Sequence, residues 1–382
     1  MRSVSIVEPE HAQTMRKSIL LFFITASSFN ARATDRVVSA DGLYPTIGEA
    51  LLASSDGDRI LVQPGIYPED VFISKTISIL PNQEGTRPRI TGNVTLADAD
   101  GKHVLLSGLR MENLIRTGTF TQRTEVDVVD CRVGFVTLKD PYLYVRLLRD
   151  TVNYQASLSS GAVVGSDFLG GGAGAVAFVS FEPPVAFPDE IVVIGNTFGT
   201  LVTGSGVLIF TNARFHIQNN YMRCFTNEAI RVHRPSAYSG AICTILNNTF
   251  TRSETSSTTV TAITNFPVSP LTMNVRNNAI IGYTSGMGIG TPHVSNVITG
   301  EVSIDIATGA PSIASPLINA GDPDPRYLDL DLTTNDVGCY GGSNSRANFT
   351  TGMGSAVVGF MQAPRVVAQG DAVNINAIGF DR

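Results

Sequence analysis

The chain has 382 residues, of which 43% are hydrophobic and 16% are charged, and its formal net charge is −6. A mildly acidic chain has no electrostatic footprint for nucleic acid or for an anionic membrane surface. The absence of a long stretch rich in Ala, Glu, Lys and Leu argues against a long-helix protein and favours many short strands with tight turns.

The N-terminal segment has the features of an export signal. Met15-Arg16-Lys17 precedes a short apolar run, and Ala31-Arg32-Ala33 follows it. A basic start, an apolar run of about ten residues and small residues at positions −3 and −1 predict a signal peptide over residues 1–33, with cleavage after Ala33 and Met15 as the natural start. The run is too short to span a bilayer, so we expect no membrane span in the mature chain. The protein is therefore expected to be secreted, periplasmic or on the cell surface, through bacterial export.

A short helix is predicted before the first strands. Residues 44–53 have apolar side chains at helical spacing, with Pro45 and Thr46 at the start and Asp56-Gly57-Asp58 beyond the end. Two short strands around Pro64-Gly65 and a further strand from Ile77 follow. Such a helix would cover the open end of a stack of coils, where backbone groups and apolar side chains are otherwise exposed.

An eight-residue pattern recurs along the middle of the chain: apolar, any, apolar, any, small or polar, Asn or Asp, any, apolar. The clear copies start at Phe215, Cys243 and Met273, and looser copies span 145–152, 162–169 and 191–198. The sixth position advances from 196 to 220, 248 and 278, in steps of 24, 28 and 30 residues. Repeats of this length, each a short strand followed by a polar turn, predict a solenoid.

The sixth position of the pattern is interpreted as structural. A sharp bend between two sheets requires a backbone conformation that Asn and Asp tolerate, and stacked amides can bond to one another and to the backbone. The column formed by these positions is predicted to contain Cys131, Asp150, Asp167, Asn196, Asn220, Asn248 and Asn278.

Alternation along each strand predicts which side chains face outward. Positions one and three should point inward, and positions two and four outward. The predicted outward pairs are Asp127/Val129, Arg146/Leu148, Val163/Gly165, Val192/Ile194, His216/Gln218, Thr244/Leu246 and Asn274/Arg276. The middle of this face is apolar, so we expect a loop or a partner to cover it. Asp127 and Arg146 are expected to form a surface ion pair, and His103 and His293 to stand alone.

The last forty residues depart from the pattern. Residues 342–354 are linker-like, and two short apolar stretches, 364–367 and 372–378, flank Gln369-Gly370-Asp371. This arrangement predicts a β-hairpin tail.

The chain resembles secreted right-handed parallel β-helix proteins of the pectate-lyase-like (pectin lyase fold) superfamily. The resemblance rests on residues 44–53 and 57–69, on the segments 315–325 and 336–341, and on the Asn column. The resemblance covers roughly residues 35–342. It implies an all-β, right-handed parallel β-helix solenoid of about ten coils with a short N-terminal capping helix. The expected division is a signal peptide (1–33), a β-helix with end caps (34–342), and a linker with a C-terminal hairpin (343–382).

The candidate site lies around Arg231 and His233. Alternation places both outward, and Tyr238 follows in a loop. Arginine binds uronate or sulfate groups bidentately, and a histidine can move a proton near neutral pH. In a lyase, Arg231 would neutralise a substrate carboxylate, and His233 or Tyr238 would take the neighbouring proton. The substrate-binding candidates are Arg234, Glu182 and Asp189.

No metal set is complete in the sequence. Asp322, Asp324, Asp329 and Asp331 offer carboxylates of the kind that calcium uses, without the spacing of a known calcium loop. No cofactor is expected, and Ca²⁺ is the alternative. Cys131, Cys224, Cys243 and Cys339 are either buried hydrophobic residues or disulfide partners, with Cys224 and Cys243 the most local pair.

Three functions fit the sequence. A non-catalytic extracellular scaffold or carbohydrate-contacting protein is favoured, because no catalytic set is complete. The Gly-His-Gly and Arg-x-Lys motifs of hydrolases in the resembled superfamily are absent, which counts against a hydrolase. The first alternative is a polysaccharide lyase or related carbohydrate-active enzyme. The ligand residues of a lyase would be scattered in sequence. The second is an adhesin or a module of a larger surface protein, with residues 343–382 connecting to a partner. The expected partner is extracellular polysaccharide.

Overall fold

In the computed structural model of the chain, the described residues are 33–170, 174–179, 190–201, 205–210, 214–223, 228–233, 243–252, 261–266, 273–283, 285–287, 293–294, 296–299, 304–348, 356–362 and 376–381. The predicted signal peptide lies outside these residues, apart from Ala33. None of the helices in the described part of the chain is long and apolar enough to cross a membrane.

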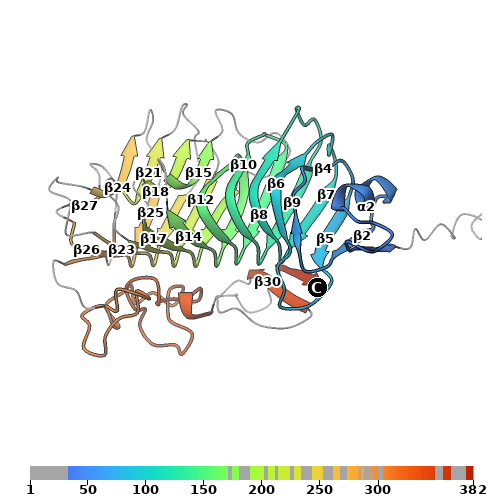
Figure 1. The fold of residues 1–382 in the computed structure, drawn as a ribbon. Helices are drawn as coiled ribbons and strands as arrows, with labels where there is room; N and C mark the ends of the chain where they lie inside the picture. Colours follow the sequence, from blue (N-terminus) through green and yellow to red (C-terminus); the bar gives the residue numbers. More distant parts are fainter. Residues whose placement is uncertain are drawn as a thin grey trace, which may run out of the picture.

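Two long parallel sheets run the length of the molecule (Figure 1). The first, sheet A, has 12 strands in the order β1 (Asp35–Val38), β2 (Arg59–Val62), β5 (Ile77–Pro81), β7 (His103–Ser107), β9 (Thr124–Val129), β11 (Leu143–Leu148), β13 (Ser160–Val164), β16 (Glu190–Ile194), β19 (Arg214–Gln218), β22 (Cys243–Leu246), β25 (Met273–Arg276) and β28 (His293–Val294).

Sheet B contains the remaining parallel strands. They are β3 (Ile66–Tyr67), β4 (Val71–Ile73), β6 (Arg89–Leu96), β8 (Arg110–Arg116), β10 (Arg132–Leu138), β12 (Thr151–Leu158), β14 (Asp167–Gly170), β15 (Gly174–Val179), β17 (Thr197–Leu201), β18 (Ser205–Phe210), β20 (Tyr221–Arg223), β21 (Ile230–His233), β23 (Thr249–Thr251), β24 (Thr261–Phe266), β26 (Ala279–Ile281), β27 (Ser285–Met287) and β29 (Val297–Thr299).

The chain alternates between the two sheets, so each coil adds strands to both of them. Beyond the first pair, β1 and β2, a strand of sheet A pairs with the equivalent strands of neighbouring coils and not with the strands next to it in sequence. For example, β11 pairs with β9 and β13. Parallel strands in such a stack lie about 4.8 Å apart. The predicted fold class, an all-β right-handed parallel β-helix, is confirmed.

The predicted capping helix is α2 (Ile47–Ala53), which covers the first coils. Thr46 is its N-cap, and the Thr46 hydroxyl accepts a hydrogen bond from the Glu49 N–H. The Glu69 carboxylate accepts the N–H groups of Ile47 and Gly48 at 2.8 and 2.9 Å. Negative charge at the start of a helix satisfies its unpaired donors and complements the helix dipole.

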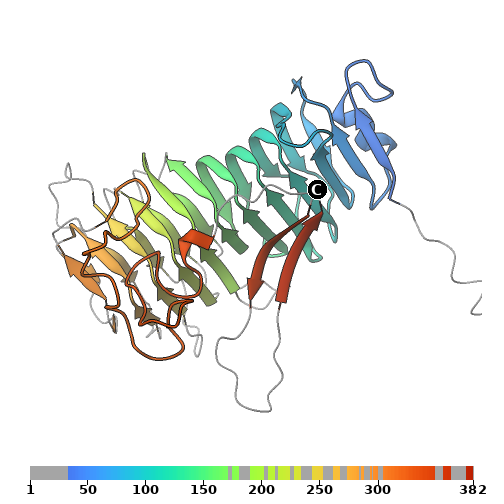
Figure 2. The same cartoon turned by 90° about the horizontal axis from the view of Figure 1, so that it is seen from below.

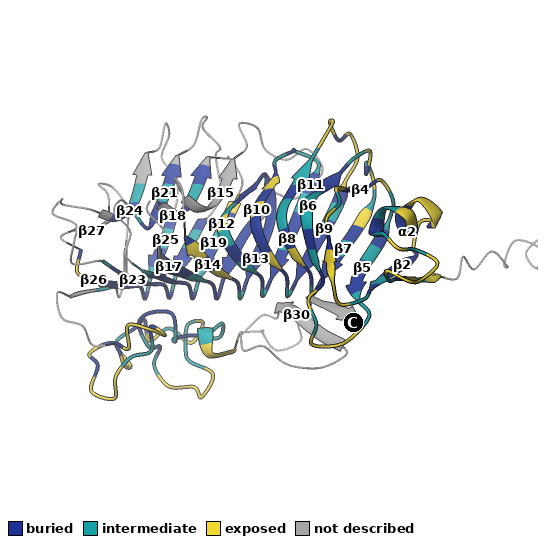
Figure 3. Cartoon of the chain, viewed as in Figure 1, coloured by how far each residue is buried: buried dark blue, intermediate teal, exposed yellow. Residues whose placement is uncertain are grey.

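The apolar core lies between the two sheets and extends along their whole length (Figure 3). The strands β19, β22 and β25 bury positions one and three of the repeat and leave positions two and four partly exposed. The predicted alternation is therefore confirmed in these coils.

The asparagine column is confirmed as a buried ladder. The Asn196 side-chain amide donates to Asn220 Oδ1, Asn220 donates to Asn248 and Asn248 donates to Asn278, with distances from 2.9 to 3.0 Å. Each Oδ1 also accepts the backbone N–H of the preceding rung, as Asn248 Oδ1 does from Asn220 N at 3.1 Å. The ladder continues one rung further than predicted, to Asn296.

The sequence prediction was wrong by one residue in the coil of β13. Ser166, not Asp167, occupies the column: its N–H donates to Asn196 Oδ1, and its hydroxyl accepts from the Asp150 N–H. Asp167 is exposed at the start of β14. The outward pair of this coil is consequently Ala162/Val164 and not Val163/Gly165. The cause is Gly161, which takes an inward position and pairs with Val145.

The fifth position of each repeat makes the bend. Asn219, Asn247 and Asn277 all have φ near +52°, in the left-handed region that Asn tolerates. Their side chains lie on the outside of the corner and hold the segment 304–348, here called the strap. Asn219 Nδ2 donates to the Gly341 carbonyl, and Asn247 Nδ2 donates to Asn335 Oδ1 at 2.7 Å. In each Asn-Asn pair, the first side chain therefore bonds to the strap and the second bonds within the ladder.

The strap runs back along the β-helix after the last coil (Figure 1). Leu317, Val337 and Cys339 form an outer apolar cluster with Tyr221 and Ile281 of the coils. A short 3-10 helix, Arg346–Asn348, ends it. Two antiparallel strands follow, β30 (Ala356–Gln362) and β31 (Asn376–Asp381), which form the C-terminal hairpin. The sequence placed the first hairpin strand after Pro364, whereas β30 ends before that proline.

Three of the four cysteines are buried in the described part of the chain. Cys131 and Cys339 are free thiols inside the protein. Burial raises the pKa of the Cys339 thiol to about 11 and raises the pKa of Cys131 further. Cys243 is buried in the core. Cys224 lies outside the described residues, so its pairing with Cys243 stays a prediction.

Candidate functional site

Most of the predicted site falls outside the described residues. Glu182, Asp189, Arg234 and Tyr238 are not described, and only the backbone of His233 is described, in β21. Arg231 lies in the same strand with its side chain facing outward, while Ile230 and Val232 are buried, as alternation predicted.

Arg231 has an acidic neighbour that the sequence argument did not include. Its guanidinium lies 3.5 Å from the Glu228 carboxylate. On the adjacent strands it pairs with Leu208 and Thr264. Its neighbours in register therefore bring no second charged group beside it.

A different surface, on sheet B, gathers half-buried amides, exposed arginines and exposed aromatic side chains from successive coils. We call it the sheet B platform, and its residues are Asn93, Arg110, Asn113, Arg132, Phe135 and Tyr154. They belong to four neighbouring long strands, β6, β8, β10 and β12. Adjacent strands place equivalent residues about 5 Å apart, so the platform is a continuous face of the sheet.

Two aromatic rings form the apolar part of the platform. The Phe135 and Tyr154 rings stack with centroids 4.6 Å apart and an interplanar angle of 16°. They are nevertheless 42% and 47% exposed. A β-bulge produces this arrangement: Val133 pairs with Val152 and Phe135 with Gln155, so β12 has one extra residue in the interval that holds Tyr154. Bulges redirect side chains in this way.

Polar groups lie on both sides of the rings. Asn113 Nδ2 donates to Asn93 Oδ1 at 3.0 Å, so the two amides are held together across adjacent strands. Arg110 and Arg132 are opposite each other in register and are exposed. Arg132 contacts Asn153 at 3.3 Å. Guanidinium groups at this spacing can bind carboxylate or sulfate groups of a ligand.

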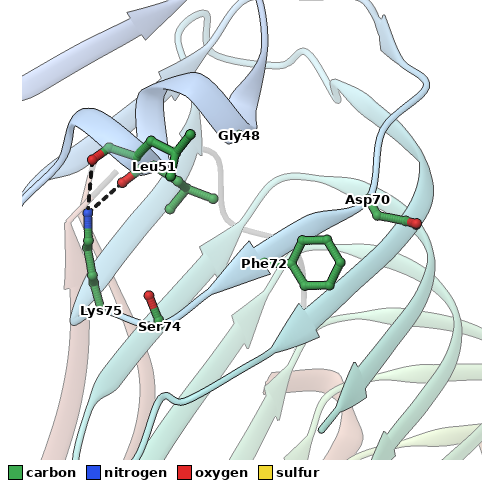
Figure 4. Close-up of a pocket in the computed structure, with 7 residues that line it drawn as sticks. Gly48, Leu51, Asp70, Phe72, Ser74 and Lys75 are labelled. Atoms are coloured by element: carbon green, nitrogen blue, oxygen red, sulfur yellow. Dashed lines mark hydrogen bonds between the residues drawn. The ribbon is translucent and has the colours of Figure 1, made fainter.

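A shallow pocket of about 220 Å³ lies at the N-terminal end of the molecule, between α2 and β4 (Figure 4). Leu51, Phe72 and Lys75 are among the residues that line it. The Lys75 ammonium donates to the carbonyl of Leu51 at 2.7 Å and to that of Ser54 at 2.6 Å. Lys75 therefore caps the end of the helix, and we assign the pocket to the capping structure.

An ionic cluster lies on the outer face of sheet A. The Asp127 side chain is only 1% exposed and accepts two hydrogen bonds from Arg146. The predicted ion pair is thus confirmed, although it is buried and not at the surface. Its other partner is His103, whose Nε2 lies 2.7 Å from Asp127 Oδ2, so the prediction that His103 stands alone was wrong. Arg146 also contacts Glu125 at 3.1 Å.

The stability of this cluster should depend on pH through His103. The hydrogen bond to Asp127 raises the pKa of His103 above 6.5. Protonated His103 therefore stabilises the folded state fully below pH 6.5, and this contribution is lost as the pH rises through the raised pKa. We expect His103→Gln to lower the free energy of unfolding at acidic pH and to have a smaller effect at alkaline pH, in urea titrations. His216→Gln is the control, and an equal loss for His103→Gln at both pH values would contradict the assignment.

The acidic residues near the end of the β-helix are engaged with protein groups. Asp322 bonds to Arg276. Arg326 holds the pKa of Asp324 down to about 2. Among the described residues, no three His, Cys, Asp or Glu side chains gather in a metal-binding arrangement. Calcium binding by this segment stays a prediction.

Sequence reasoning missed the platform for a physical reason. No outward position was predicted for Phe135, and a large apolar side chain normally marks the inward face of a strand. The sequence signal that could indicate an outward Phe135 is the pair Val133 and Val136 on either side of it. Both valines are buried. No sequence rule places the bulge that brings Tyr154 onto Phe135.

No family model matches the chain, and no curated protein matches it. Among solved structures, the chain is similar to the crystal structure of pectate lyase Pel9A, with 14% sequence identity and a TM-score of 0.27, over 82% of this chain and 98% of that chain. The fold described above follows from the strand pairing of the chain itself.

Proposed function

We propose that the protein is a secreted, non-catalytic scaffold that contacts an acidic polysaccharide through the sheet B platform. The observation that carries this proposal is the exposed Phe135–Tyr154 stack. A rigid pair of exposed rings is costly in water and offers a flat apolar surface to a ligand. The faces of sugar rings are flat and carry C–H groups, so they fit such a surface.

The polar part of the platform favours an acidic ligand. Arg110 and Arg132 are exposed on adjacent strands, and Asn93 and Asn113 supply amide groups for hydroxyls. The fork of a guanidinium group suits a planar carboxylate. These groups bind and orient a ligand, and the platform contains no histidine, so binding is the chemistry that it supports best.

The test measures binding of polygalacturonate and of a neutral galactan by isothermal titration calorimetry. Phe135→Ala combined with Tyr154→Ala should weaken binding of the acidic polymer about tenfold, equivalent to about 1.4 kcal/mol. Arg110→Ala combined with Arg132→Ala should also weaken it and reduce its dependence on salt. Ile313→Ala and Arg326→Ala remove exposed side chains from the strap and serve as matched controls. Unchanged affinity in both double variants would refute the platform.

The alternative functions predict results in two further assays. New ultraviolet absorbance from unsaturated ends, lost in Arg231→Ala and His233→Ala, would favour a polysaccharide lyase. Binding to cell envelopes that disappears when residues 343–382 are deleted would favour a module of a larger surface protein.

A further inference from the structure

The outer face of sheet A has an apolar area that is hidden from solvent. We call it the sheet A patch, and it consists of Val129, Leu148, Ala162, Val164, Val192 and Ile194. These residues point away from the core, yet none is more than 9% exposed. Side chains on the outside of a sheet become this inaccessible only when another part of the structure lies over them.

The ionic cluster borders the patch on one side. Asp127 and Arg146 are opposite each other in register, and Arg146 is opposite Ala162 of the patch. Asp127 is 1% exposed although it too faces outward. An apolar centre with a charged border on one side is the usual composition of a contact surface.

The path of the strap brings the C-terminal segment to this patch. Asn344 Nδ2 donates to Gln218 Oε1 at 3.0 Å, and Gln218 is opposite Ile194 in register. Two residues later, Arg346 bonds to Thr197 and lies 3.8 Å from Asp167. The strap therefore reaches the coils where the patch lies, and residues 349–382 continue from that point.

The C-terminal hairpin lies on the same side of the molecule. Figure 1 shows β30 beneath the coils of the N-terminal half, and the view from below in Figure 2 shows both hairpin strands over these coils. The strand sequences, AVVGFMQ and NAIGFD, are largely apolar. A two-stranded hairpin is marginally stable in water and needs a packing partner.

We propose that the sheet A patch is the docking site of this chain's own C-terminal hairpin, formed by β30 and β31. The hairpin then adds a third layer to the β-helix, packed face to face on sheet A at the usual separation of about 10 Å. It protects an apolar surface that would otherwise favour association between molecules. The hairpin is tethered through the strap and belongs to no coil, so it is a separate element that the patch holds in place.

Hydrogen–deuterium exchange of the full-length protein, followed by mass spectrometry, tests this proposal. In the wild type, the amides of β30 and β31 should be protected. Leu148→Asp places a charge in the patch without altering the core, and the hairpin amides should then exchange at least about tenfold faster while the coils of the asparagine ladder keep their protection. Val164→Ser is a second, milder variant if Leu148→Asp fails to fold. Leu43→Asp, at a position that is 82% exposed, is the control.

Two results would overturn the proposal. One is a wild-type hairpin that exchanges as fast as an unstructured peptide. The other is a protected hairpin whose exchange is unchanged by both patch substitutions. Light scattering on the same samples identifies the source of the hairpin: a monomer with a protected hairpin is expected, and protection found only in a dimer would assign the patch to the hairpin of a second copy.

Discussion

Replacing Asn248 by alanine is expected to lower the free energy of unfolding by about 2–5 kcal/mol, one of the two largest effects of a single substitution in this protein. Asn248 is fully buried in the middle of the ladder. Its Oδ1 accepts from the N–H and the amide of Asn220, and its amide donates to Ile217 O at 3.0 Å and to Asn278. Alanine would leave several of these groups unsatisfied in the core, and each buried unpaired group costs about 1–3 kcal/mol.

The measurement is urea unfolding followed by circular dichroism. Asn153→Ala is the control, because Asn153 is only half-buried in β12 and its side chain accepts a hydrogen bond from Arg132, another residue outside the core. It should change the free energy of unfolding by less than about 0.5 kcal/mol. Equal, small effects for the two variants would mean that the ladder does not hold the corner together.

The second large effect is expected for Gly161→Ala. Gly161 has φ +134°, a conformation that residues with a Cβ rarely adopt, and an added Cβ would lie 1.9 Å from the Val145 carbonyl oxygen on the adjacent coil. Backbone cannot move aside as a flexible side chain can, so the two coils would have to separate. We expect a loss of about 2–5 kcal/mol or failure to fold.

Gly118→Ala separates the cost of the backbone conformation from the cost of the clash with the Val145 carbonyl. Gly118 has φ +72°, and an added Cβ there has no atom within 4 Å. This variant should lose only about 1–2 kcal/mol, the cost of a left-handed conformation for alanine. Thermal unfolding of both variants gives the comparison, and a Gly161→Ala protein as stable as Gly118→Ala would show that the contact with Val145 does not exist.

The sequence was sufficient to predict the β-helix because its repeat is chemically explicit. The Asn residues of the ladder have few substitutes at a buried corner, and the apolar residues beside Asn220, Asn248 and Asn278 alternate clearly. In β13 every residue is small or apolar and every one is buried, so alternation contains no information about register there. That is why the sequence pattern placed Asp167 in the column position that Ser166 occupies.

The role of the first Asn in each Asn-Asn pair was not foreseen. A sequence pattern shows that Asn247 can adopt the bend, but its contact is with Asn335, 88 residues away. The same limit applies to His103, whose partner Asp127 lies one coil later. Such contacts depend on the lengths of the coils and of their insertions. These lengths cannot be predicted from a repeat whose steps are unequal.

The candidate site was less predictable than the fold. Arg231 faces outward as expected and contacts Glu228, whereas the other predicted site residues, apart from the backbone of His233, lie outside the described residues. The platform depends on a bulge in β12 and on Phe135 facing outward, against the usual preference of a large apolar side chain. Both features are determined by packing between coils, which the order of residues does not reveal.

The most direct test of the proposed function incubates the wild-type protein with polygalacturonate and measures binding and cleavage in the same sample. Calorimetry reports binding, and ultraviolet absorbance together with a reducing-end assay reports cleavage. We expect saturable binding that weakens as salt is added, with no new chain ends. Cleavage of the polymer, or the absence of any binding to it, would contradict the account.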